Sequence, residues 1–333
     1  MGIDILSVTP HQVSRDMRGY SVFFYGEPKS GKTTIATKFP NHLLLAFEKG
    51  YNAIPGAMAQ PINSWAEFLK VIQQLTKDEA KQRFETIIID TADIAYDYCS
   101  TYICNNHGVD SVSDIPFGKG YGLIAKEFDT KLRKIVQLGY GLVIISHETD
   151  KTFTDVNGQQ YNKIVPTLDK RANNIVARMC DIIGYARIIA DQNGTETTKL
   201  FMRGTPRFEA GSRFKYTPDF IDFSYNNLVN AIGDAIDKQA AEEGSEHFTE
   251  ERETSNADTT TELDFDSLFT EAMNIIKKCS ADEEKMESYY APRITEIVAT
   301  YLGKNNKLSE IRRDQKEQLS LIVDDLKGLI VIE

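Results

Sequence analysis

A glycine-rich segment near the N-terminus has the residue types and spacing that bind phosphate groups. Gly26 and the triplet Gly31-Lys32-Thr33 follow the pattern G-x4-G-K-T, directly after an apolar run at residues 22–25. The glycines allow a tight turn whose N–H groups point at a phosphate, while the lysine reaches the β- and γ-phosphates and the threonine hydroxyl ligates Mg2+. A helix predicted over residues 33–38 adds its positive dipole end. The predicted nucleotide-binding residues are Gly26, Glu27, Pro28, Lys29, Ser30, Gly31, Lys32, Thr33 and Thr34.

Two carboxylates follow predicted strands and are candidates for the chemistry of that nucleotide. Asp90 ends the apolar strand 86–90, and we expect it to hold Mg2+ beside the phosphate loop through strand adjacency. Its alternative role is to cap the following helix. Glu48 follows the strand 43–47, and strand ends of a parallel sheet face one crevice, where a glutamate polarises the attacking water. Its alternative is a surface turn in which Lys49 is its partner.

His147 ends a third predicted strand, residues 141–145, and is expected to face the same crevice. A polar side chain there can sense the γ-phosphate and relay hydrolysis to the segment behind it. The alternative is a histidine that only satisfies local hydrogen bonds. The predicted catalytic residues are Glu48, Lys32 and His147, and the predicted metal ligands are Thr33 and Asp90.

The strands alternate with segments of helical periodicity, which predicts an α/β fold with a mainly parallel sheet and helices on both sides. The predicted helices are residues 65–81, 94–106, 125–138 and 225–241, and a glycine-rich loop is predicted at residues 116–122. Asn157-Gly158 and Asn193-Gly194 are hairpin signals, so added β-hairpins are expected over residues 153–165 and 187–202.

Charge divides the chain into unlike parts. The net charge is −11, yet residues 1–240 hold 27 basic and 27 acidic residues, so residues 241–333 carry the whole acidic excess. Residues 151–215 hold 11 basic against 6 acidic residues, so the acidic net charge does not exclude a polyanionic partner that binds there. We predict a domain at residues 1–240, an acidic flexible linker at 241–263 and a helical module at 264–333, which is either a small bundle or a docking site for a protein partner.

Composition bounds the cellular context. Hydrophobic residues make up 41% of the chain, no run of 18 apolar residues occurs, and no signal-peptide pattern opens it. The four cysteines, Cys99, Cys104, Cys180 and Cys279, lack the spacing of a disulfide framework or a zinc site. These features predict a cytoplasmic protein without a membrane partner.

The order of these motifs resembles the core of RecA-type ATPases. The resemblance rests on residues 26–34, Glu48 after the second strand, Asp90, and His147, and it extends over about residues 18–235. The chain is similar to phage-encoded, minimal RecA-like ATPases of single-strand annealing and recombination, acting in the host cytoplasm. The resemblance implies Mg2+-dependent ATP hydrolysis, single-stranded DNA binding and a homo-oligomer. An N-terminal polymerisation domain, as in full recombinases, is not evident.

Two segments are candidates for the DNA contact, and several basic residues for a contact to a neighbouring subunit. Residues 116–122 and 148–165 combine aromatic side chains, on which bases stack, with lysines for phosphates. Such mixtures are also common in ordinary hairpins. A second group of basic residues could contact the γ-phosphate bound by a neighbouring subunit, or could form ion pairs on the surface. They are Lys170, Arg171, Arg178, Arg203, Arg207 and Arg213. A nucleotide-gated DNA-loading or partner-recruiting protein with slow hydrolysis is the alternative function, and a motor for DNA packaging or unwinding is a weaker one.

Overall fold

The computed structural model describes residues 5–190, 193–251 and 264–330 and divides the chain into two units. One unit is Thr9–Ala257, and the other combines Met1–Val8 with Asp258–Glu333. Each unit has its own hydrophobic core.

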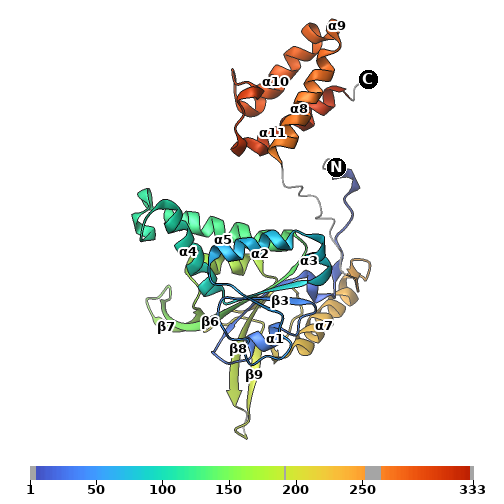
Figure 1. The fold of residues 1–333 in the computed structure, drawn as a ribbon. Helices are drawn as coiled ribbons and strands as arrows, with labels where there is room; N and C mark the ends of the chain where they lie inside the picture. Colours follow the sequence, from blue (N-terminus) through green and yellow to red (C-terminus); the bar gives the residue numbers. More distant parts are fainter. Residues whose placement is uncertain (1–4, 191–192, 252–263, 331–333) are drawn as a thin grey trace. The chain divides into compact units, whose positions relative to one another are not determined.

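A mainly parallel sheet forms the centre of the larger unit (Figure 1). Its strands lie in the order β11-β9-β8-β2-β6-β5-β3-β4, and the pairings from β8 to β4 are all parallel. The predicted fold class is therefore confirmed. The strands are β2 (Ser21–Gly26), β3 (His42–Ala46), β4 (Ala59–Pro61), β5 (Thr86–Asp90), β6 (Gly141–Thr154), β7 (Gln160–Pro166), β8 (Ile182–Ala190), β9 (Glu196–Phe201), β10 (Gly211–Ser212) and β11 (Phe220–Asp222).

Helices cover both faces of this sheet because alternate strand residues point to opposite sides and nearly all are apolar. Phe23, Tyr25 and Ile87 face the helices α2, α4, α5 and α6, whereas Val22 and Ile88 face α1 and α7. The helices of this unit are α1 (Lys32–Ala36), α2 (Trp65–Leu75), α3 (Asp78–Arg83), α4 (Ala92–His107), α5 (Gly120–Gln137), α6 (Lys170–Met179) and α7 (Tyr225–Glu243).

The strand that ends in Asp90 is not adjacent to the strand that leads into the phosphate loop, so this prediction was wrong. β6 lies between β2 and β5, and it pairs with both of them in parallel. The register places His147 beside Gly26, and Asp90 beside Ile145. β2 and β5 consequently end at the same edge of the sheet, where β6 leaves it, and Asp90 reaches the loop across β6.

Both predicted hairpins are present and project from the sheet (Figure 1). β6 continues beyond the sheet and pairs antiparallel with β7 through a turn in which Gly158 has a φ of +82°. β8 pairs antiparallel with β9, and Gly194 in its turn has a φ of +79°. β6 is longer than predicted because one continuous strand serves first the sheet and then the hairpin.

Two predicted boundaries shift. The glycine-rich loop 116–122 is helical from Gly120 onward, where a side chain would lie 2.7 Å from the Val112 carbonyl oxygen. Glycine here reflects close packing instead of a flexible loop. The predicted linker is also ordered at its start, because α7 extends to Glu243 and β12 (Phe248–Thr249) pairs with β1 (Val13–Ser14). The rest of that predicted linker, residues 252–263, lies outside the described residues.

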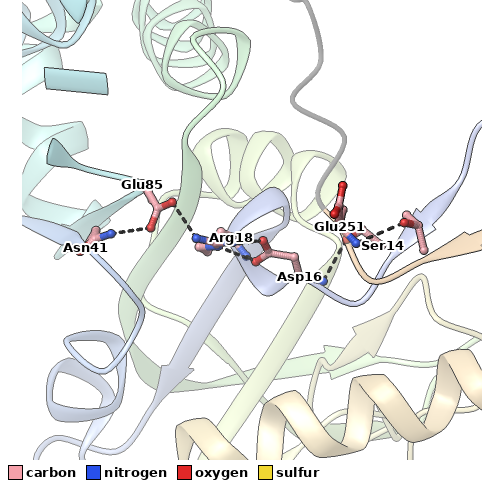
Figure 2. Close-up of polar contacts among 7 residues, drawn as sticks. Ser14, Asp16, Arg18, Asn41, Glu85 and Glu251 are labelled. Atoms are coloured by element: carbon pink, nitrogen blue, oxygen red, sulfur yellow. Dashed lines mark hydrogen bonds and ion pairs between the residues drawn. The ribbon is translucent and has the colours of Figure 1, made fainter. Parts of the chain in front are cut away.

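A polar network joins elements at the opposite edge of the sheet, where the strands begin (Figure 2). Arg18 donates to both oxygens of Asp16 and, at 2.7 Å, to Glu85 just before β5. Glu85 in turn accepts from the Asn41 amide at 2.7 Å, just before β3. The Arg18 guanidinium therefore connects, through Glu85, the residues that precede β5 and β3. The bonds to Asp16 and Glu85 raise the pKa of Arg18 further above its ordinary range.

The smaller unit contains three main helices around an apolar core. They are α8 (Phe265–Ser280), α10 (Ala291–Leu302) and α11 (Lys316–Ile330), with α9 (Glu283–Lys285) and a π-helical turn (Met286–Tyr290) before α10. Leu319, Ile322 and Leu326 of α11 are buried in this core. Before α11, residues 308–315 form two short 3-10 turns. Within the described part of the chain, no helix combines the length and apolar character needed to span a membrane.

Candidate functional site: a phosphate loop at the carboxyl edge of the sheet

Gly26 and Gly31 are needed in the phosphate loop for different reasons. Gly26 pairs with Ala186 of β8, and a Cβ on Gly26 would lie 2.0 Å from the Ala186 carbonyl oxygen. Gly31 has a left-handed φ of +88° at the start of α1, with open space around it. The first glycine thus allows two strands to approach, and the second allows the turn into the helix. α1 has five residues and begins one residue before the predicted helix.

The Lys32 side chain is held inside the loop. Its ammonium group donates to the carbonyl oxygens of Gly26 at 2.9 Å and Glu27 at 2.7 Å, and only 5% of the residue is exposed. Burial lowers the pKa of Lys32 to about 8, against the opposing attraction of Asp90 and other nearby carboxylates. The group remains mostly charged at neutral pH and lies where a lysine can contact phosphate oxygens.

Thr33 and Asp90, the two predicted metal ligands, are in contact. The Thr33 hydroxyl donates to Asp90 Oδ2 at 2.7 Å. Asp90 is 2% exposed, and its Oδ1 has no hydrogen-bond partner among the described residues. Burial raises the pKa of Asp90 to about 6, which is the signature of a buried carboxylate short of positive charge.

These two oxygen donors fit Mg2+ bound together with nucleotide phosphates. Mg2+ takes one or two protein ligands, and phosphate and water oxygens complete its octahedron. In residues 5–190, 193–251 and 264–330, no group of three or more His, Cys, Asp or Glu side chains could hold a metal by itself. The site therefore suits a cation that arrives with its nucleotide.

Glu48 and His147 lie against each other from different strands. Glu48 follows β3, His147 lies on β6, and Glu48 Oε2 is 3.5 Å from His147 Nε2. The hydrogen bond to His147 lowers the pKa of Glu48, and the same bond raises the pKa of His147. The sequence predicted each residue at the crevice, and the structure adds that they form a pair.

One cavity of about 510 Å3 collects these side chains. Gly50 and Ile54 also line it, and sequence reasoning assigned them no role. A Cβ on Gly50 would lie 3.5 Å from Glu48 Oε1, 3.8 Å from Thr33 Oγ1 and 3.9 Å from Asp90 Oδ2. The only available sequence signal was a glycine two residues after Glu48. The cavity is lined by Pro28, Lys29, Gly31, Lys32, Thr33, Thr34, Glu48, Gly50, Ile54, Asp90, Ile145 and His147.

The β6–β7 hairpin, which covers most of the predicted DNA segment 148–165, displays a pair of aromatic side chains. Phe153 and Tyr161 face each other across the hairpin with ring centroids 5.9 Å apart, and they are 37% and 39% exposed. The Lys163 ammonium lies 5.8 Å from the Phe153 ring and also pairs with Glu209 at 3.0 Å. The hairpin therefore offers a stacking surface with one cation already engaged by a carboxylate.

The second predicted DNA segment, residues 116–122, presents one aromatic ring to solvent. Phe117 is 93% exposed and has a φ of +63°, which is uncommon for a bulky residue. The Lys119 ammonium lies 5.6 Å from its ring, while Tyr121 packs under the Arg171 guanidinium at 4.7 Å. Phe117 and Lys119 are available for contact, and Tyr121 is partly covered.

The arginines considered for a neighbouring subunit separate into two groups. Arg203 donates to the carbonyl oxygens of Thr217 and Lys215, and Arg213 donates to Asp181 and to the Arg178 carbonyl oxygen. Both side chains therefore bind loops of their own chain, which gives each charge a role without a neighbouring subunit. The candidates that stay open are Lys170, Arg171, Arg178 and Arg207.

Comparison with known proteins gives one family match. The sequence model of a family described as AAA domain matches residues 18–214. These residues include the phosphate loop, Glu48, Asp90 and His147, together with both predicted DNA segments.

The chain is also similar to a curated protein and to solved structures. The SPbeta prophage-derived uncharacterized protein YorG of Bacillus subtilis (strain 168) is 34% identical over 344 aligned residues, which cover 99% of each chain. The crystal structure of the flagellar accessory protein FlaH from Methanocaldococcus jannaschii matches at 10% identity, with a TM-score of 0.34, over 62% of this chain and 85% of that one.

Proposed function

This chain belongs to the AAA-domain family of P-loop ATPases, and from that premise we propose that it is a Mg2+-dependent ATPase of the RecA-like type. The observation that carries the proposal is the convergence of Lys32, Thr33, Asp90, Glu48 and His147 on one cavity, from a loop and three strands. Each residue type in that set matches a requirement of phosphoryl transfer: positioning, charge stabilisation and activation of water.

The proposed mechanism assigns one task to each side chain. Lys32 leaves its loop carbonyls and donates to the β- and γ-phosphate oxygens. Glu48 accepts a proton from the water that attacks the γ-phosphorus in line, while the bond from that phosphorus to the β,γ-bridging oxygen breaks and ADP leaves. His147 orients Glu48 through the bond at 3.5 Å and keeps it ionised. Thr33 and Asp90 would hold Mg2+, which supplies positive charge to the phosphate oxygens when bound.

We further propose that the ATPase acts on single-stranded DNA in phage recombination or annealing. The exposed Phe153–Tyr161 pair and Phe117 support this, because base stacking on aromatic rings needs no sequence readout. The excess of basic residues over 151–215 supports it as well. The similarity to a prophage-derived protein supports the phage setting. As a homo-oligomer, the chain would use one of the open basic residues, such as Arg178 or Arg207, at a neighbour's nucleotide.

The test is ATP hydrolysis by the full chain with and without single-stranded DNA. We expect DNA to raise the rate, and Phe153→Ala to remove most of that rise and to weaken DNA binding about tenfold or more, as expected for the loss of a stacked base. Val156→Ala, at a fully exposed apolar position in the same hairpin, is the matched control and should behave as wild type. A rate that is independent of DNA for every variant would contradict the DNA-dependent part of the proposal.

A nucleotide-gated loading protein with slow hydrolysis is the second candidate. The observation that favours it is the Glu48–His147 bond, because a carboxylate engaged by an imidazole is a weaker base toward water. The two candidates differ in the measured turnover. A DNA-stimulated rate supports the ATPase, whereas nucleotide-dependent DNA binding with negligible turnover supports the loader.

A further inference from the structure

Asp93 connects three elements at the point where β6 leaves the central sheet. It lies in the first turn of α4, three residues after Asp90. Its Oδ1 accepts a hydrogen bond from Ser146 Oγ on β6 at 3.0 Å and another from Thr167 Oγ1, just after β7, at 2.5 Å. A single carboxylate oxygen therefore joins α4 to both strands of the β6–β7 hairpin at its base.

Main-chain contacts at the same place make this junction continuous with the nucleotide site. The Thr167 N–H donates to the His147 carbonyl oxygen at 3.0 Å, and Ser146 Oγ lies 3.2 Å from that same oxygen. The next pair outward, Glu148 with Pro166, is the first rung of the hairpin. His147 is thus held on its side-chain face by Glu48 and at its carbonyl by the residues that Asp93 joins.

The junction is polar and only partly buried, because Ser146 lies in the interior whereas Thr167 and its bond to Asp93 are exposed. Ser146 is fully buried, and burial in a low-dielectric region strengthens each hydrogen bond and penalises each missing one. Asp93 Oδ2 and His147 Nδ1 are also buried, and neither has a hydrogen-bond partner within the described ranges. Without the Asp93 carboxylate, the Ser146 and Thr167 hydroxyls would lose their common acceptor. The contacts left between Thr167 and β6 would be the one between the two hydroxyls at 3.4 Å and the bond from the Thr167 N–H to the His147 carbonyl oxygen.

We propose that Asp93 is a positioning residue that fixes the base of the β6–β7 hairpin to the His147 end of β6, so that a nucleotide bound at the phosphate loop changes the hairpin. The inference rests on the proposed function, since it concerns how that nucleotide site acts on the hairpin. Asp93 is not among the residues that line the cavity, so we assign it a positioning role and not a chemical one.

Hydrogen–deuterium exchange of the full chain, with and without a non-hydrolysable ATP analogue and Mg2+, tests this coupling without DNA. In the wild type, the nucleotide should protect residues 26–34 and change exchange over residues 148–167 at least about threefold. Asp93→Ala should keep the protection of 26–34 and reduce the nucleotide-induced change over 148–167 to less than about twofold. Asp93→Asn retains the acceptor oxygen and should restore it.

Two further variants keep the test decisive if Asp93→Ala fails to fold. Thr167→Val preserves shape and the main-chain N–H but removes the hydroxyl, so it should reproduce the loss of the hairpin response. Asp97→Ala, an exposed carboxylate one turn later on α4, is the matched control and should respond as wild type.

The outcomes separate this inference from the proposed function. If the nucleotide protects residues 26–34 of the wild type but does not change exchange over residues 148–167, the coupling is overturned and nucleotide binding is left intact. A normal hairpin response in Thr167→Val and Asp93→Ala overturns the role of Asp93. Absence of protection at 26–34 in the wild type overturns the proposed nucleotide site itself, and the coupling with it.

Discussion

Glu48 and Asp90 are carboxylates at the ends of two adjacent strands, yet their environments shift their pKa values in opposite directions. The bond to His147 lowers the pKa of Glu48, whereas burial raises that of Asp90 to about 6. A half-exposed, ionised carboxylate suits a base for water, and a buried one that lacks a partner suits a metal ligand. The predicted roles of Glu48 as a base and Asp90 as a metal ligand thus have an electrostatic basis.

The pairing of Glu48 with His147 predicts a coupled titration. Both groups are charged, and the pair is stabilising, between the lowered pKa of Glu48 and the raised pKa of His147. Glu48→Gln removes the carboxylate, so the pKa of His147 should fall toward its ordinary value of about 6.5. NMR titration of the His147 imidazole measures this change. His42, at the start of β3 and away from this pair, is the internal reference. An unchanged pKa of His147 in Glu48→Gln would show that the two side chains do not interact in solution.

Most individual residues of the site could be located from the sequence, because each follows a recognisable strand or motif. They are the phosphate loop, Glu48, Asp90 and His147. Gly50 and Asp93 could not, since nothing in their local sequence marks them. A side chain at Gly50 would approach Glu48, Thr33 and Asp90. Asp93 binds the hydroxyls of two residues that lie 53 and 74 positions later in the sequence. Their roles depend on contacts that only the folded chain creates.

The positions of the strands and hairpins along the chain could be predicted from the sequence, but the order of the strands in the sheet could not. Apolar runs marked β3, β5 and the first part of β6, and Asn-Gly pairs marked both turns. The insertion of β6 between β2 and β5 leaves no trace in any single strand, because all three are apolar on both faces. Chain order alone therefore suggested the wrong neighbour for Asp90.

The Arg18 network predicts where the larger unit is sensitive to mutation away from its active site. Arg18→Met keeps much of the stem but leaves Asp16 and Glu85 without their shared donor, which should cost about 1–2 kcal/mol of the free energy of unfolding. Thermal or denaturant unfolding measures the loss. Arg133→Met, which removes a surface pair with Asp129 on α5, is the control and should change stability by less than about 0.5 kcal/mol. Equal effects of the two substitutions would contradict a specific role for Arg18.

For the whole molecule, the separation of charge is the feature with a functional consequence. Residues 252–333 contain 17 acidic and 11 basic residues, whereas residues 1–240 are balanced. The protein-docking role of the helical module stays a prediction. The start of the predicted linker was misjudged because its acidic, polar composition concealed the pairing of β12 with β1.

We expect the acidic C-terminal region to compete with DNA for the basic surface. Deleting residues 252–333 retains β12 and should tighten binding of single-stranded DNA at low salt, with the difference shrinking as salt screens the charges. Fluorescence anisotropy across a salt series measures this, and nucleotide affinity should stay unchanged. Equal DNA affinity of the two chains at every salt concentration would remove the competition.

We propose that the cavity hydrolyses ATP with Glu48 as the base. The ATP turnover of Glu48→Gln, measured beside its affinity for ATP, tests this role, and the exposed neighbour Lys49→Gln is the matched control. We expect turnover to fall about a hundredfold or more, with ATP affinity within about threefold of wild type, and a normal rate for Lys49→Gln. Turnover of Glu48→Gln equal to that of the wild type would rule out Glu48 as the base.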